Sequence, residues 1–384
     1  MFQRVEASIL IASTVVCIAI GGGVVAGCGT STDATTTTVT AEVSSSSSAI
    51  SSTVSSETTV SAPPESTISQ IGILAPEIAN DYGWNQQGVD GAKTVASDLG
   101  ATISVKDGAG YSDISPQVRQ LVEAGADFLI AHAAGYATVA ANLGQELKVP
   151  TLVICGGEAS LHPDLVQDIE PRPQDGAYLA GVMAAKMTKT KTVGIVISAD
   201  EGVFNIASAG FATGLRATDS TVKLVFAQVG PAAFSDAASA KRTAEAMIAG
   251  GADILFGMGD GASFGYMQAC ETAAPPSGAD KVWFIDWIGD KTLIDSKGVV
   301  LSSVLMDFQP VYQEAIEALS NGTFGRELLF LGLDNQGIGL LKTPHIPEDI
   351  WAAVEQARED IIAGTVVVPM VFDKEELDKL IREG

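Results

Sequence analysis

Aromatic rings and polar side chains recur directly after short apolar runs in this sequence, where parallel sheets meet their ligands. Aromatic residues are only 6% of the chain, so this recurrence is informative. The residues in question are Asp81, Trp84, Asn85, Tyr111, His132, Tyr136, Phe204, Asn205, Phe234, Asp260, Phe264, Asp286, Trp287 and Asp290. Rings stack on the faces of a flat ligand, while carboxylates accept hydrogen bonds from its hydroxyl or N–H groups. The set predicts a site for a flat, heteroaromatic or hydroxylated small molecule.

The stretch "NDYGWNQQG" (80–88) also has a purely structural interpretation. Asp81 is a suitable cap for a following helix, Asn85 suits its first turn, and Trp84 suits the core. Two glycine-rich segments, "DGAGYSD" and "GMGDGASFG", lack the Lys-Ser/Thr of a phosphate loop and are interpreted as tight turns. Both interpretations of Trp84 stay open at the sequence level.

The sequence offers little for catalysis. It has only 3 His, at 132, 162 and 345, and none forms a metal-spaced pair. There is no G-x-S-x-G nucleophile motif. Asp81 with Asp260 or Asp286 is the one conceivable carboxylate pair, and the sequence does not give its separation. We expect a binding protein without metal or cofactor rather than an enzyme.

The order of apolar runs and helical patterns predicts the strands and helices that position the candidate binding residues. Short strand-like runs alternate with amphipathic helices from "IGILAP" to "VPTLVICGG", and the rhythm begins again at "KTVGIVIS" (191–198). The phrases "EAGADFLIAHAAG" and "IAGGADILFGMGDG" align, with Asp127 over Asp253. The expected fold class is α/β, with two similar doubly wound parallel-sheet lobes and the ligand between them.

The N-terminus resembles an export signal. An apolar stretch ends in "VVAGC", so residues 1–27 are interpreted as a signal peptide and Cys28 as the lipidated N-terminus. A transmembrane anchor is the alternative. Residues 28–69 are rich in Ser and Thr and are expected to form a disordered tether. The predicted location is extracytoplasmic, on the cell membrane.

Net charge and cysteine content indicate which partners and which cysteine roles to expect. The net charge of −24 argues against nucleic-acid binding, because no basic field is present to neutralise phosphates. Cys155 and Cys270 remain after the signal and the lipidated cysteine, and each is expected to be a small buried apolar residue.

Seven segments, in order, resemble the basic membrane protein family of substrate-binding lipoproteins. They are "DYGWNQQGVDGAK", "ADFLIAHAAGY", "DGAYLAGVMAAKMTKTKTVGIV", "GFATGL", "GADILFGMGDGASFG", "WFIDWIGDK" and "VVLSSVLMDFQPVYQEAIEALSNGTFG". The likeness covers residues 70–384 and implies a type I periplasmic binding protein. It further implies a monomer that delivers a purine nucleoside or nucleobase to an ABC permease and its ATPase.

The resemblance also assigns roles to residues. It places Asp81, Trp84 and Asn85 on the ligand wall, with the Trp84 ring against a base. An acidic residue of "WFIDWIGD" would hold ribose hydroxyls, and Asp286 is preferred over Asp290. Met306 stands where nucleoside binders have Lys, so the same ligand pose is not assumed. Alternatives are a lipid-tethered sensor for a membrane receptor, or a non-purine ligand such as a sugar.

Type I binding proteins cross between their lobes three times, and here the crossings are expected near residues 172, 306 and 326. The N-terminal lobe would then comprise residues 70–172 plus 306–325, and the C-terminal lobe residues 173–305 plus 326–384. The segment "PEDIWAAVEQAREDIIAG" is expected to form a helix on the second lobe. Its predicted inward face is Ile350, Val354, Ala357, Ile361 and Ile362.

Overall fold

A computed structural model describes residues 68–383. The expected signal peptide, Cys28 and most of the expected tether lie outside these residues. Ser69, expected to be in the tether, belongs to the fold instead, because its backbone N–H donates to a carboxylate oxygen of Asp127 at 2.9 Å and its hydroxyl donates at 2.6 Å. No helix within the described residues is long and apolar enough to cross a membrane.

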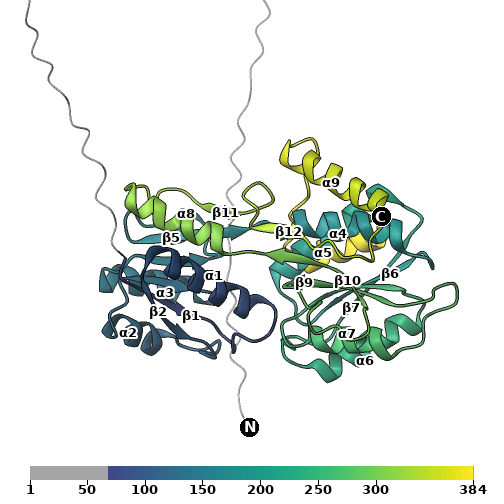
Figure 1. Ribbon diagram of the computed structural model, residues 1–384, viewed down its shortest axis with the longest axis horizontal. Helices are drawn as coiled ribbons and strands as arrows, with labels where there is room; N and C mark the ends of the chain where they lie inside the picture. The colour runs from purple at the N-terminus through teal and green to yellow at the C-terminus, as the bar shows by residue number, and fades with distance from the viewer. Residues whose placement is uncertain (1–67, 384) are drawn as a thin grey trace, which may run out of the picture. The chain divides into compact units, whose positions relative to one another are not determined.

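The first lobe is built on a six-stranded sheet of order β11-β5-β4-β3-β1-β2, in which every pair is parallel (Figure 1). Its strands are β1 (Gln70–Leu74), β2 (Thr102–Lys106), β3 (Phe128–Ala131), β4 (Thr151–Ile154), β5 (Val166–Pro171) and β11 (Leu329–Leu331). Its helices are α1 (Trp84–Leu99), α2 (Ser115–Glu123), α3 (Ala137–Leu147) and α8 (Gln309–Ser320), with the 3-10 turns η1 (Ala134–Tyr136) and η2 (Glu158–Ser160).

The second lobe repeats this plan in the order β12-β10-β9-β8-β6-β7, where only β12 is antiparallel to its neighbour. Its strands are β6 (Thr192–Ile197), β7 (Lys223–Gln228), β8 (Ile254–Met258), β9 (Trp283–Ile288), β10 (Val300–Met306) and β12 (Ile338–Leu340). Its helices are α4 (Pro173–Met187), α5 (Gly202–Thr218), α6 (Ala237–Ala249), α7 (Ser263–Thr272), α9 (Glu348–Ile362) and α10 (Lys374–Glu383). The two similar α/β lobes confirm the predicted fold class.

Local sequence explains the helix that carries Trp84. Val89, Ala92, Val95 and Ala96 recur at helical spacing and are buried against the first sheet. Gly100 ends the helix in the left-handed conformation, at φ 67°, where a residue without Cβ is favoured. The predicted turn from strand to helix therefore places Trp84 at the first residue of α1.

The chain passes between the sheets after β5, after β10 and after β11. The third passage was expected near residue 326, but Leu329 pairs with Ile169 in the first sheet. The expected lobe boundary at residues 325 and 326 is therefore too early, because β11 satisfies its backbone groups on β5. The chain crosses only between Leu331 and Ile338, the start of β12.

Helix α9 packs on α4 of the second lobe. Val354 is buried, and Ile350, Ala357 and Ile361 pack partly buried against the core. Ile362 was wrongly predicted to face inward, since it is 50% exposed in the last turn of the helix.

Candidate functional site

A cavity of about 710 Å³ lies between the two lobes, at the carboxyl ends of their strands. Six of the predicted residues line it, namely Trp84, Tyr111, Phe204, Asp260, Trp287 and Met306. Phe234, noted with them in the sequence, also lines it. The other predicted residues, Asp81, Asn85, His132, Tyr136, Asn205, Phe264, Asp286 and Asp290, do not line it. What Asp81, Asn85, His132, Tyr136 and Asp286 do is visible in their hydrogen bonds.

Asp81 and Asn85 hold the turn between β1 and α1. The carboxylate of Asp81 accepts backbone N–H bonds from Gly83, Asn85 and Gln86 at 3.0–3.1 Å, and a bond from the Asn85 side-chain amide at 2.8 Å. The amide oxygen of Asn85 accepts the backbone N–H of Glu77 at 3.1 Å. With both side chains buried and engaged, their contribution is to present Trp84 and Glu77 to the cavity.

Trp84 is fixed by His132 from the end of β3. The indole N–H donates to the backbone oxygen of His132 at 3.0 Å, and the two rings stack with centroids 4.5 Å apart. Phe308 meets the indole edge-on at 5.2 Å. The indole stays partly exposed and lines the cavity, so it is held rigidly in a position where a ligand ring can meet it.

His132 is neutral in this arrangement. Its Nε2 lies 2.8 Å from the backbone oxygen of Trp84, which only accepts, so Nε2 carries the hydrogen. Nδ1 then accepts the hydroxyl of Tyr312 at 2.7 Å. Burial lowers the pKa of His132 to about 4, against the opposing influence of the Trp84 carbonyl and Asp81. His132 positions Trp84 and does not itself line the cavity.

Tyr111 and Tyr136 shape the loop after β2. The hydroxyl of Tyr136 donates to the backbone oxygen of Gly110 at 2.5 Å, next to Tyr111 in the chain. The Tyr111 ring stacks on Phe234 of the second lobe, with centroids 5.8 Å apart. A second contact across the cleft is the Ser235 hydroxyl, which donates to Glu77 at 2.9 Å. The loop that carries Phe234 and Ser235 thus contacts the first lobe at two points beside the cavity.

Asp286 is engaged in a buried ion pair. Its carboxylate lies 2.5 Å from the ammonium of Lys291, and both side chains are at most 1% exposed. Lys291 also donates to the backbone oxygen of Tyr82, across the cleft, at 3.2 Å. The chain places Lys291 five residues after Asp286, yet nothing in the sequence pattern marks it as a partner. The pair acts as a tie between the lobes.

Among the carboxylates that line the cavity, Asp260 has the pKa that is shifted most. Its pKa is raised to about 7, first by burial and then by the negative charges of Asp81 and Glu77, while Lys291 opposes the rise. Its side chain makes no hydrogen bond within the described part of the chain. This carboxyl group is therefore free to meet a ligand.

Several lining residues were not singled out from the sequence, among them Glu77, Glu201, Asp236 and Ile288. Glu77 and Glu201 follow β1 and β6 within a few residues, so the same strand-end rule would have found them. Ile288 has φ 83°, which is costly for a β-branched residue and marks local strain beside the cavity. Cys155 also lines the cavity, and burial raises its thiol pKa, which disfavours the nucleophilic thiolate.

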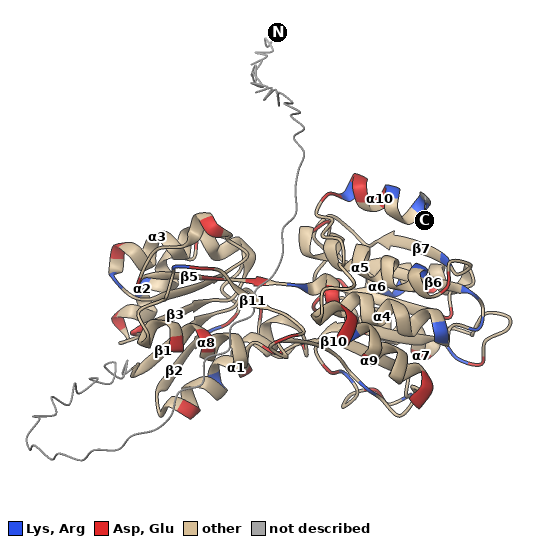
Figure 2. Cartoon of the chain, turned by 90° about the horizontal axis from the view of Figure 1, so that it is seen from above, with Lys and Arg blue, Asp and Glu red and all other residues tan. Residues whose placement is uncertain are grey.

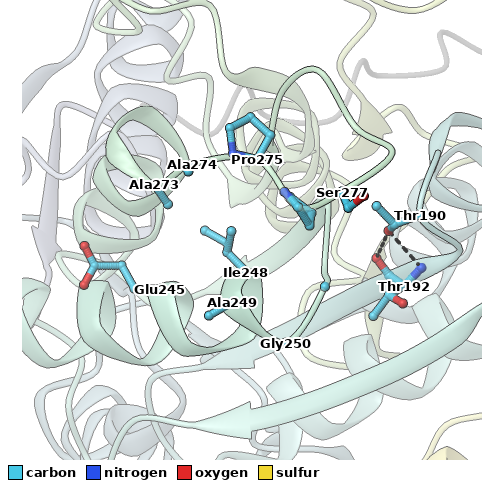
Figure 3. Close-up of a pocket in the computed structure, with 12 residues that line it drawn as sticks. Thr190, Thr192, Glu245, Ile248, Ala249, Gly250, Ala273, Ala274, Pro275 and Ser277 are labelled. Atoms are coloured by element: carbon cyan, nitrogen blue, oxygen red, sulfur yellow. Dashed lines mark hydrogen bonds between the residues drawn. The ribbon is translucent and has the colours of Figure 1, made fainter.

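A second hollow, of about 670 Å³, lies on the second lobe (Figure 3). Thr192 begins β6, and residues 250 and 251 and 273–277 precede β8 and β9, so the hollow lies at the amino ends of the strands. Ligands of parallel sheets bind at the opposite ends. Residues 68–383 also contain no group of three His, Cys, Asp or Glu side chains arranged to hold a metal ion.

Comparison with known proteins finds a family model over most of the described chain. Residues 68–371 match the Bmp model, described as ABC transporter substrate-binding protein PnrA-like. The ABC transporter nucleoside-binding protein BmpA of Lactococcus lactis subsp. cremoris is 31% identical over 205 residues, covering 51% of this chain and 58% of that protein. Basic membrane protein A2 of Borrelia garinii subsp. bavariensis is 23% identical over 324 residues. The match covers 83% of this chain and 93% of that protein.

Solved structures share the fold. An ABC transporter solute-binding protein from Aeropyrum pernix K1 superposes with a TM-score of 0.69 at 20% identity, covering 82% of this chain and 97% of that chain. At this identity the likeness concerns the arrangement of the two lobes alone.

Proposed function

Because the chain belongs to the family of PnrA-like ABC transporter substrate-binding proteins, we propose that it captures a small heteroaromatic ligand between its lobes. A purine nucleoside or nucleobase is the ligand class that we propose. The observation that carries this proposal is the cavity lined by aromatic rings from both lobes, with Trp84 held in place by His132. Such rings stack on a flat ligand, and Asp260 would bond to its edge.

We further propose that the protein acts outside the cytoplasm, tethered through lipidated Cys28. The closed, ligand-bound form would dock on an ABC permease that works with its ATPase. Closure of two lobes about connecting segments is a hinge motion, and the three passages between the sheets are its natural hinges.

The geometry removes the two carboxylate pairs that the sequence suggested for hydrolysis, Asp81 with Asp260 and Asp286 with Asp260. A hydrolytic carboxylate pair would need two free carboxyl groups facing the substrate. Asp81 is occupied by four hydrogen bonds, and Asp286 by Lys291, so neither is available to pair with Asp260.

A thermal-shift screen of residues 68–384 tests the proposal, because residues 68–383 contain all the described helices and strands. Purine nucleosides, nucleobases and sugars are the probes, since an excess of about 100-fold over Kd stabilises by about 2.7 kcal/mol. A purine should raise Tm. Trp84→Ala should weaken this ligand at least tenfold and Trp84→Phe less, while Trp351→Ala on α9 serves as the matched control. A shift with sugars alone, or unchanged affinity in Trp84→Ala, would refute the purine-stacking proposal.

A further inference from the structure

The cavity wall is acidic and lacks cations. Its lining includes the four carboxylates of Glu77, Glu201, Asp236 and Asp260. Among the described residues that line it, none is Lys, Arg or His. A low-dielectric cavity with one sign of charge attracts ligands of the opposite sign. The net charge of −24 acts in the same direction, with acidic residues placed on both lobes (Figure 2).

The basic groups nearest to this wall are already engaged. Lys291 is bound to Asp286 and to the backbone oxygen of Tyr82. Arg172 lies between two prolines of the lining, but its guanidinium packs over the Phe330 ring, 4.3 Å from the centroid. The acidic lining is therefore not neutralised by a neighbouring free cation among residues 68–383.

Two of the four carboxylates are themselves free. Glu77 accepts the Ser235 hydroxyl, and Asp236 accepts the backbone N–H of Ser239 as a helix cap. The side chains of Glu201 and Asp260 make no hydrogen bond within the described residues. Glu201 is exposed to water, whereas the Asp260 side chain is partly buried. An unpartnered, partly buried carboxylate is costly, and a cationic ligand group offsets that cost.

Aromatic rings surround the same space. Tyr111 and Phe234 stack across the cleft, and Phe204 meets Phe234 edge-on with centroids 6.3 Å apart. Trp84 and Trp287 complete the lining rings. Ring faces attract cations through their quadrupoles, and cages of rings with a carboxylate suit amine and quaternary ammonium groups.

We propose that the ligand captured here carries a positive charge, an amine or quaternary nitrogen that sits among these rings beside Asp260. This inference rests on the proposed capture of a small heteroaromatic ligand between the lobes, and it replaces the neutral purine by a ligand that bears a cationic nitrogen. A neutral hydroxylated ligand would leave the free carboxylates unbalanced. A cation satisfies them and gains from the ring faces at the same time.

The titration of Asp260 supports the same assignment. Its pKa is raised to about 7, first by burial and then by the negative charges of Asp81, Glu77 and Asp286, while the positive charge of Lys291 opposes the rise. A bound cation favours the ionised carboxylate, so the pKa falls on binding and a proton is released. Affinity for a cation should then rise from pH 6 to pH 8, while affinity for a neutral ligand should not.

Calorimetry with charge-matched pairs tests the proposal. Choline is compared with its neutral carbon analogue 3,3-dimethylbutan-1-ol, and 1-methylnicotinamide with nicotinamide, each at pH 6, 7 and 8. We expect the cation of a pair to bind at least tenfold more tightly at pH 8. Asp260→Asn should remove most of this preference and its pH dependence. Glu245→Gln removes one charge from the same lobe at the other end of the sheet, and should change neither.

The outcomes separate the two proposals. Equal or tighter binding of the neutral partner, or binding of neutral purines alone, overturns the charge inference and leaves capture in the cleft standing. A cation preference that survives in Asp260→Asn also overturns it. If no cation, neutral analogue or purine binds at any pH, both proposals fail together.

Discussion

Trp84 owes its position to a chain of buried polar contacts rather than to apolar packing alone. The chain runs from the indole N–H to the His132 carbonyl, and from the imidazole to the Tyr312 hydroxyl on α8. Because the imidazole is neutral and fully buried, each ring nitrogen needs its partner. The Trp84 ring, which lines the cavity, is thus supported by two residues that do not line it.

The first prediction is that Tyr312→Phe lowers the free energy of unfolding by about 1–3 kcal/mol, because it leaves Nδ1 of buried His132 without a donor. Urea denaturation followed by circular dichroism measures this. Tyr178→Phe is the control, since Tyr178 is buried as a residue but its hydroxyl makes no hydrogen bond within the described residues. An equal loss in both variants would show that the hydroxyl of Tyr312 does not support His132.

At the scale of elements, α4 and α5 of the second lobe pack with their backbones nearly in contact. A Cβ at Gly214 would lie 2.2 Å from the backbone oxygen of Tyr178, and one at Gly181 would lie 2.2 Å from that of Phe211. Glycine is required here for close approach and not for an unusual φ. This packing places Phe204, at the start of α5, beside the cavity.

The second prediction is that Gly214→Ala destabilises the protein by about 1–3 kcal/mol or more, because the added methyl group forces the two helices apart. Gly202→Ala, in the first turn of the same helix, meets its nearest atom at 3.5 Å and should change stability little. Thermal unfolding of both variants gives the comparison. A Gly214→Ala variant as stable as the wild type would mean that the helices adjust without cost.

At the scale of the whole described fold, the lobes meet at a close backbone contact. A Cβ at Gly289, after β9, would lie 1.9 Å from the backbone oxygen of Tyr82 in the first lobe. The ammonium of Lys291 donates to the same oxygen. This point therefore permits only glycine when the lobes are in contact.

The third prediction is that Gly289→Ala keeps each lobe folded but prevents full closure. Ligand affinity should fall at least tenfold, and the radius of gyration from X-ray scattering at saturating ligand should exceed that of the wild type. Gly339→Ala is the control, because no atom lies within 4 Å of its added Cβ. Wild-type affinity and scattering in Gly289→Ala would exclude this contact from closure.

The sequence by itself determined the two-lobed α/β plan, because strand and helix periodicities are local and the second half repeats the first. It also located the aromatic residues that line the cavity, since residues that follow parallel strands meet at one edge of a sheet. Trp84, Tyr111, Phe204 and Trp287 were found in this way. The family resemblance, noted from ordered segments, is confirmed by the match over residues 68–371.

Only the tertiary structure decided which polar residues face the cavity and which support it. Asp81 and Asp260 both follow strands. The carboxylate of Asp81 accepts hydrogen bonds from backbone N–H groups of its own turn, whereas that of Asp260 makes no hydrogen bond within the described residues. The pairing of Asp286 with Lys291, and the place of β11 beside β5, depend likewise on contacts between distant segments. Spacing along a chain does not specify such partners, because hydrogen bonds and ion pairs form only when the folded backbone brings donor and acceptor within about 3 Å.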